Sequence, residues 1–377
     1  MTRKERILTA AAFKEADRVP IELAIGEKEK ELPICQKIAR FIEEQADNFI
    51  HIGGVDWGFF GLAGESWQEV IEDRPGLYQR IKRIFRSPVG EFFAITRHFY
   101  PDLDNPDFHW EKRHISSLSD LERLTEAERK PCLISLNDYL AGVEQVGESG
   151  VPMLGRLHPL GSLVRNATME EVYGWLISER SLIHRFLERT NQQVGQTIEQ
   201  LGRQGISGWF ITYAHEMFIP PWLGRRHFEE FVLPYDQQVN EVIHRFGGKV
   251  RAHCHGRCMN FLTLMAQMGI DSIEPLEPPP WGDVDLKEAK RLVGDRMLLS
   301  GNIPCQNFWR MSQEDVRESV KKAIAEAGAG GGLTLRTTGG QAGVSAYLEP
   351  EMLTKIVGNV EAYIQAGLKY GQYPIKC

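Results

Sequence analysis

Lys249-Val-Arg-Ala-His-Cys-His-Gly256 alternates polar and apolar side chains in the manner of a β-strand. Because successive side chains in a strand point to opposite faces, Arg251, His253 and His255 share one face, and the other face is apolar. An apolar strand face packs well against helices. We therefore expect the three polar side chains to point into the interior of a closed sheet.

Seven further runs rich in β-branched or aromatic residues recur along the chain, with longer helical patterns between them. These runs span residues 18–25, 54–62, 152–158, 209–215, 271–276, 296–302 and 332–338. Alternation of strand and helix favours parallel strands joined by right-handed crossovers. Eight such units predict an α/β fold, a distorted (β/α)8 TIM barrel, with an open doubly wound sheet as the alternative.

One region interrupts the repeat after the second predicted strand. Two short strand-like runs flank Ser87-Pro-Val-Gly90, and a loop rich in Pro and Asp follows them. This pattern predicts a β-hairpin insertion at about 78–114 within a single domain that spans 1–377. A lid over the site, a structural element and a homodimer contact are the alternatives for its role.

The charge balance and the cysteine content narrow the class of protein. The chain of 377 residues has 44 Lys and Arg against 51 Asp and Glu, a net charge of −7, which disfavours a nucleic-acid-binding surface. No stretch approaches the roughly 18 apolar residues of a membrane span. The six cysteines are scattered and do not form a disulfide framework. We expect a cytoplasmic protein.

Polar side chains gather where the predicted strands end, and the active sites of α/β barrels lie at that end. The strand ends supply His158, His215 with Glu216, His253 with His255, Glu277, Asn302 and Thr338. Two imidazoles on one strand face can chelate one metal ion, and a carboxylate from a neighbouring strand can complete the set. We therefore predict His253, His255 and Glu277 as metal ligands; the alternative is that both histidines line a pocket for an organic substrate.

The other strand-end residues are predicted to handle the substrate. Glu216 is predicted as the catalytic acid or base, and His215 as an accessory donor. The predicted substrate-binding residues are His158, Arg251, Asn302 and Thr338. Since a buried guanidinium is costly unless it is paired, Arg251 should also meet a carboxylate inside the barrel, with Glu22 and Glu274 as the candidates.

Several motifs together resemble the uroporphyrinogen decarboxylase superfamily over nearly the whole chain. They read Asp17-Arg-Val-Pro-Ile21, Phe231-Val-Leu-Pro-Tyr235, Ala252-His-Cys-His-Gly256, Glu274-Pro-Leu-Glu277, Leu299-Ser-Gly-Asn-Ile303 and Tyr370-Gly-Gln-Tyr373. The resemblance implies a distorted barrel and one of two activities. One branch of the superfamily decarboxylates porphyrinogens, and the other moves methyl groups to or from a corrinoid protein.

The resemblance favours the methyltransferase branch. The decarboxylases hold their polycarboxylate substrate with arginines after the first strand, and the matching stretch here, 20–27, has none. The methyltransferases hold zinc with a His-x-Cys pair and a later Cys. Here His253 matches the first ligand, His255 replaces the Cys, and Thr337 or Thr338 falls near the later one. Both thiolates are missing, so zinc is implied only with a changed ligand set.

The resemblance thus implies an enzyme that moves a methyl group between a small methylated donor or acceptor and a corrinoid, which a partner protein supplies. Two alternatives stay open. A decarboxylase or lyase for a smaller acid would point Arg156, Arg251 or Arg336 into the barrel mouth. A non-catalytic module would bind a tetrapyrrole-like cofactor without turnover.

Overall fold

The computed structural model describes residues 1–104, 108–339 and 341–375. The chain divides into two compact units. The first consists of Met1–Gly54, Ser135–Arg156 and Gly205–Cys377, and the second of Val55–Ile134 and Leu157–Gln204. None of the helices in these described ranges is long and apolar enough to cross a membrane.

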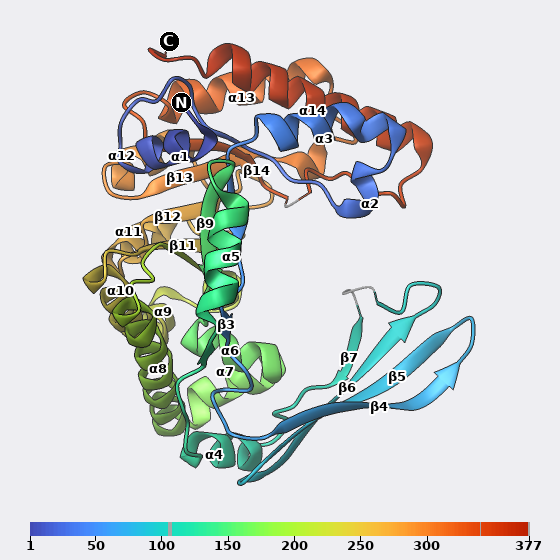
Figure 1. Cartoon of the computed structure of the whole chain (residues 1–377), viewed down its shortest axis with the longest axis vertical. Helices are drawn as coiled ribbons and strands as arrows, with labels where there is room; N and C mark the ends of the chain where they lie inside the picture. The colour runs from blue at the N-terminus through green and yellow to red at the C-terminus, as the bar shows by residue number, and fades with distance from the viewer. Residues whose placement is uncertain (105–107, 340, 376–377) are drawn as a thin grey trace. The chain divides into compact units, whose positions relative to one another are not determined.

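The first unit contains an eight-stranded parallel sheet in the order β1-β14-β13-β12-β11-β10-β9-β2 (Figure 1). Its strands are β1 (Ile21–Glu22), β2 (Asn48–His51), β9 (Gly150–Gly155), β10 (Trp209–Thr212), β11 (Lys249–Cys254), β12 (Ser272–Pro275), β13 (Leu298–Ile303) and β14 (Leu333–Thr337). At the ends of this order, β1 meets β2 through a bond of 2.8 Å from the Asp47 amide to the Ile21 carbonyl. The predicted (β/α)8 barrel is confirmed, and it is nearly closed.

Helices precede, join and follow the strands of the barrel. They are α1 (Arg3–Ala11), α2 (Glu27–Lys30), α3 (Gln36–Glu44), α5 (Leu136–Val146), α9 (Arg225–Phe231), α10 (Leu233–Arg245), α11 (Leu262–Gln267), α12 (Leu286–Val293), α13 (Gln313–Ala327) and α14 (Pro350–Tyr370). The side chains of Asp285 and Ser312 cap α12 and α13 by accepting from backbone N–H groups of the first turn. Pro350 opens α14, where its missing N–H costs nothing.

Apolar side chains fill the end of the barrel where the strands begin. Ile7 of α1 is buried there with Val151, Met153, Trp209 and Ile211. Phe49 packs against Trp209 edge to face, with ring centroids 4.9 Å apart, and adds to this cluster. Because this end is a packed core, the polar residues of the barrel interior lie toward the carboxyl ends of the strands, which we call the mouth.

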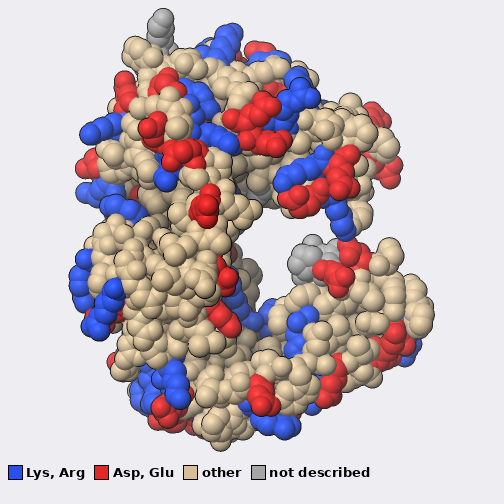
Figure 2. Space-filling view, viewed as in Figure 1, with Lys and Arg blue, Asp and Glu red and all other residues tan. Residues whose placement is uncertain are grey.

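The second unit carries a four-stranded antiparallel sheet in the order β4 (Glu65–Arg74), β5 (Tyr78–Ser87), β6 (Gly90–Phe99) and β7 (His109–Lys112). A two-stranded pair joins β3 (Val55–Asp56) to β8 (Leu133–Ile134). Its helices are α4 (Leu118–Glu126), α6 (Pro159–Asn166), α7 (Met169–Ser178) and α8 (Arg180–Arg203). Figure 2 shows acidic and basic side chains interspersed on the face in view.

Two predictions about this part of the chain need correction. The second barrel strand is β2, and of the predicted strand 54–62 only Val55–Asp56 is extended, pairing with β8 outside the barrel. The aromatic residues that suggested a strand pack instead in the second unit, with the Phe59 ring 4.6 Å from that of Phe85. The β5–β6 hairpin is confirmed, but it is the centre of a four-stranded sheet that begins at Glu65.

Candidate active site at the barrel mouth

Glu22 and Arg251 form a buried ion pair across the barrel interior. The Arg251 Nη2 atom lies 2.7 Å from Glu22 Oε2, and the two side chains are 2% and 1% exposed. Ser300 and Thr334 donate to Glu22 Oε1, each at 2.5 Å. The prediction that a carboxylate inside the barrel pairs with Arg251 is confirmed, and Glu22 is that carboxylate.

The surroundings of Glu22 keep it ionised. Burial alone would raise its pKa, but the charges of Arg251 and Arg336 and the hydroxyl donors lower the pKa below its ordinary value. Arg336 Nη1 lies 3.2 Å from Glu22 Oε2. The Tyr363 hydroxyl donates to the Glu22 backbone oxygen at 2.9 Å and so ties α14 to the same strand.

His253 lies above this network and is oriented by Glu274. Its Nδ1 atom is 2.7 Å from Glu274 Oε1, and Arg336 Nε is 2.7 Å from the other oxygen of the same carboxylate. Burial would raise the pKa of Glu274, but Arg336 and His253 lower it far below its ordinary range. Glu274 thus forms an ion pair with Arg336, and Glu22 is the carboxylate that binds Arg251. Since Nδ1 faces Glu274, Nε2 is the nitrogen left to meet a ligand.

His255 pairs with Glu277 beside it. The His255 Nδ1 atom lies 3.0 Å from Glu277 Oε1, and the imidazole is 39% exposed. Glu277 also accepts from the Gly256 backbone N–H at 2.8 Å and from Gln306 Nε2 at 3.0 Å. The hydrogen bond with Glu277 raises the pKa of His255 against the opposing effect of burial, and the charge of Glu216 adds to the rise. The contacts of His255 at the mouth therefore favour its protonated form.

The same contacts explain the charge of Glu277. Burial would raise its pKa, but the hydrogen bonds from His255 and from the Gly256 backbone lower it. The Thr338 hydroxyl donates to Gln306 Oε1 at 2.5 Å. Thr338 thereby orients the Gln306 amide, whose Nε2 donates to Glu277. The structure thus brings together three predicted site residues, His255, Glu277 and Thr338, through Gln306, which the sequence did not single out.

The three predicted metal ligands do not converge on one point. Within the described part of the barrel unit, no three His, Cys, Asp or Glu side chains bring ligand atoms within 4.8 Å of one another. The rings of His253 and His255 are 4.6 Å apart, but each Nδ1 faces its own carboxylate. Cys254 is fully buried, and burial raises the pKa of its thiol well above the ordinary value. The donor set does not fit a closed tetrahedral zinc site in this geometry.

Comparison with known proteins identifies the family of this chain. Residues 100–340 match the family described as uroporphyrinogen decarboxylase (URO-D). The chain belongs to the uroporphyrinogen decarboxylase family. The search of curated proteins gives no match.

Two solved structures are similar to this chain, and the first supports the fold. A methyltransferase from Methanosarcina mazei aligns over 97% of this chain and 99% of its own, with a TM-score of 0.56 and 15% identity. A B12-independent methionine synthase from a Shewanella species aligns over 96% of each chain, with a TM-score of 0.42 and 11% identity. The first likeness extends along the whole uroporphyrinogen decarboxylase-type barrel of this chain.

Two aromatic residues that the sequence analysis missed also lie at the mouth of this family barrel. The Tyr213 hydroxyl is 2.6 Å from His51 Nε2, and its ring lies 5.4 Å from that of His253. Burial lowers the pKa of His51, which favours its neutral form. His51 ends β2 and Tyr213 follows β10, so the barrel's strand order is what brings them to the same end.

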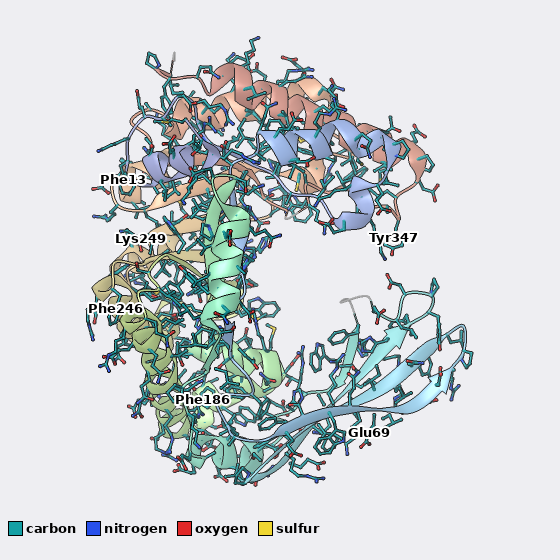
Figure 3. The ribbon with its side chains drawn as sticks, viewed as in Figure 1. Phe13, Glu69, Phe186, Phe246, Lys249 and Tyr347 are labelled. Carbon is teal, nitrogen blue, oxygen red and sulfur yellow. The ribbon has the colours of Figure 1, made fainter. Side chains whose placement is uncertain are left out.

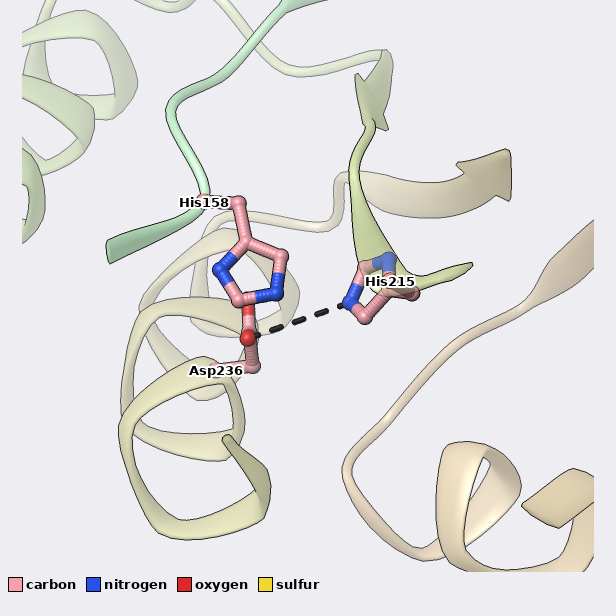
Figure 4. A group of neighbouring side chains, drawn as sticks. All are labelled: His158, His215 and Asp236. Atoms are coloured by element: carbon pink, nitrogen blue, oxygen red, sulfur yellow. Dashed lines mark ion pairs between the residues drawn. The ribbon is translucent and has the colours of Figure 1, made fainter. Parts of the chain in front are cut away.

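His215 follows β10, at the mouth end of this uroporphyrinogen decarboxylase-type barrel. It is fully buried, and its Nε2 atom is 3.8 Å from Asp236 Oδ2 (Figure 4). Arg156 Nη2 binds the other Asp236 oxygen at 2.6 Å and Asn240 Oδ1 at 2.9 Å. The accessory donor role of His215 stays a prediction, as does the acid or base role of Glu216, which follows His215 in the 3₁₀ turn His215–Phe218.

The remaining predicted substrate-binding residues lie in different surroundings. His158 belongs to the second unit and caps α6, because its Nδ1 accepts from the Gly161 backbone N–H at 3.2 Å. Asn302 lines a cavity of about 290 Å³ together with Pro278, Asp283 and Lys322. Substrate binding by His158, Arg251, Asn302 and Thr338 stays a prediction.

Proposed function

We propose that this member of the uroporphyrinogen decarboxylase family is a corrinoid-dependent methyltransferase. It moves a methyl group between a small methylated substrate and a corrinoid carried by a partner protein. The His255–Glu277 pair carries this proposal, because it places a proton donor with a raised pKa at the barrel mouth. The fold likeness to the methyltransferase from Methanosarcina mazei supports the same activity.

The chemistry needs a proton at the atom that loses the methyl group. When the methyl carbon leaves an ether oxygen or amine nitrogen, the electrons of the broken bond stay on that heteroatom, and a proton has to neutralise it. The corrinoid supplies the nucleophile that takes the methyl group. His255 donates the proton from its imidazolium form, and Glu277 stabilises that form before the reaction. His253, fixed by Glu274, presents its Nε2 atom to the substrate.

Decarboxylation of an acid receives less support from the arginines. That activity requires cationic side chains free to hold substrate carboxylates. Arg156 binds Asp236, Arg251 binds Glu22, and Arg336 binds both Glu22 and Glu274. Because their carboxylate partners are buried, releasing any of these three guanidinium groups for a substrate would leave a buried charge unpaired.

Incubation with cob(I)alamin and a panel of small methyl ethers and methylamines tests the proposal. We expect loss of the cob(I)alamin absorbance with at least one donor, together with one equivalent of the demethylated product by mass spectrometry. A panel that gives no spectral change, while a small carboxylic acid releases CO2, would instead support the lyase alternative.

The zinc content is a separate prediction. Because the ligand atoms of His253, His255 and Glu277 do not converge, we expect protein purified without added metal to contain far less than one equivalent of zinc by elemental analysis. Near-stoichiometric zinc that is lost in a His253→Ala/His255→Ala double variant would contradict this and restore the two histidines as ligands.

A further inference from the structure

Large aromatic side chains are exposed on loops that follow four barrel strands. They are Trp222 after β10, Trp281 after β12, Trp309 after β13 and Tyr347 after β14, with exposed fractions of 54%, 44%, 48% and 71%. Figure 3 shows Tyr347 projecting from its loop. Loops that follow parallel strands lie at the mouth, the same end as His253 and His255. Exposed Trp side chains are enriched among the residues that dominate binding at protein interfaces.

Two of these tryptophans belong to one continuous patch. Asn307 Oδ1 accepts from Trp281 Nε1 at 3.4 Å and from Arg310 Nη2 at 2.9 Å. The Arg310 guanidinium lies 5.0 Å from the centroid of the Trp309 ring. We call Trp281, Asn307, Trp309 and Arg310 the Trp–Arg patch. Its members come from two loops and are held together by their own contacts.

The Trp–Arg patch borders the proton donor. Gln306, which binds Glu277, immediately precedes Asn307 of the patch. On the other loop, Gly282 follows Trp281, and a β-carbon at Gly282 would lie 2.3 Å from the Glu277 backbone oxygen and 2.5 Å from that of Gly256. The loop that carries Trp281 therefore lies directly against the backbone that holds His255 and Glu277.

Two arginines of this region are exposed. Arg257, which follows Gly256, is exposed, and Arg310 bonds only to Asn307 in its loop. Neither arginine lies within ion-pair distance of a carboxylate among the residues that the structure describes. The chain as a whole carries a net charge of −7. Unpaired arginines beside exposed tryptophans suit an acidic protein surface, where the aromatic rings supply contact area and the arginines select charge.

We propose that the Trp–Arg patch and Arg257 dock the protein that carries the corrinoid, through an acidic surface of that partner. The inference rests on the proposed function, which requires a protein-borne corrinoid to reach His253 and His255. A partner seated on this patch would cover the loops that hold Glu277, and would bring its corrinoid to the proton donor while water is excluded. The patch therefore acts in recognition, and the residues beneath it act in the chemistry.

Calorimetric titration with a purified, cobalamin-loaded corrinoid protein tests the docking surface without turnover. We expect Trp281→Ala and Arg310→Glu each to raise the Kd about tenfold or more, as is typical of central interface residues. Raising the salt concentration should weaken binding by the wild type more than binding by Arg310→Glu. Salt screens the attraction between Arg310 and the acidic partner, and the variant lacks this attraction. With free cob(I)alamin as the acceptor, both variants should keep the wild-type rate of methyl transfer.

Two control variants, together with free cob(I)alamin as the acceptor, distinguish failure of the docking proposal from failure of the methyltransferase proposal. Arg296→Glu changes an exposed arginine that precedes β13, at the opposite end of that strand, and Leu8→Ala shortens an exposed apolar residue on α1. Both should leave the Kd unchanged. Wild-type levels of binding in Trp281→Ala and Arg310→Glu, or no binding by the wild type, would overturn the docking surface. Absence of transfer to free cob(I)alamin from every donor would count instead against the methyltransferase proposal.

Discussion

Replacing Asp47 with alanine should lower the free energy of unfolding by about 3–5 kcal/mol, the cost of leaving buried charges without their partner. Asp47 is fully buried and pairs with Arg6 Nη1 and Arg18 Nη1, each at 2.6 Å. It also accepts from the Ile21 backbone N–H at 2.8 Å. These contacts join β1 to the start of β2, two strands that are not paired with each other in the sheet. Urea unfolding followed by tryptophan fluorescence measures the change.

Asp17 provides the matched control for this prediction. It binds Arg6 Nε at 2.6 Å, but its side chain is 44% exposed, so Asp17→Ala should cost about 1 kcal/mol or less. Arg6 lowers the pKa of Asp17 to about 2. Since this folded-state pKa lies below the unfolded value, the Asp17 contribution should be present near neutral pH and be lost as the pH falls toward 2. Equal losses for the two variants would contradict a special role for Asp47.

The contact between β1 and β2 at Asp47 involves the one barrel strand that the sequence did not predict. Seven of the eight barrel strands lie within or overlap their predicted runs. The four residues of β2 (Asn48–His51) include two polar side chains and are too short to show a period. The aromatic run 54–62 beside them has a strand-like composition, but its phenylalanines pack in the second unit. Tertiary packing decided between these two segments, and local propensity could not.

The candidate site was predictable to the extent that it depends on one strand. Alternation along β11 places Arg251 inside the barrel, and the cost of burying a charge requires a carboxylate there. Glu22 and Glu274 could therefore be named as candidates, and the structure selects Glu22. The contact between His51 and Tyr213 joins the ends of two strands that are not neighbours in the sheet. Neither residue belongs to a motif, so only the closed barrel reveals the pair. Gln306 was missed for the same reason.

Replacing His255 with alanine should reduce kcat/KM for methyl transfer by about 10²–10⁴-fold, the usual contribution of a general acid. The hydrogen bond with Glu277 raises the pKa of His255, so the imidazolium form persists to higher pH than in an isolated histidine. In the proposed reaction that form donates the proton, so the wild-type rate should fall as the pH rises through this raised pKa. Glu277→Gln removes the charge that raises the pKa, and the falling limb should move to lower pH. Rates measured across a pH series with cob(I)alamin test both statements.

His244 offers a matched histidine–carboxylate pair at the opposite end of the barrel. Its Nε2 atom lies 2.7 Å from Asp271 Oδ2, and Asp271 accepts from the Val250 backbone N–H near the start of β11. His244→Gln should leave both kcat/KM and the pH profile unchanged. Donors with more acidic leaving groups need less protonation, so they should lose less rate in His255→Ala than simple alkyl ethers do. A folded His255→Ala variant that loses the same factor with every donor would show that His255 positions the substrate and does not donate the proton.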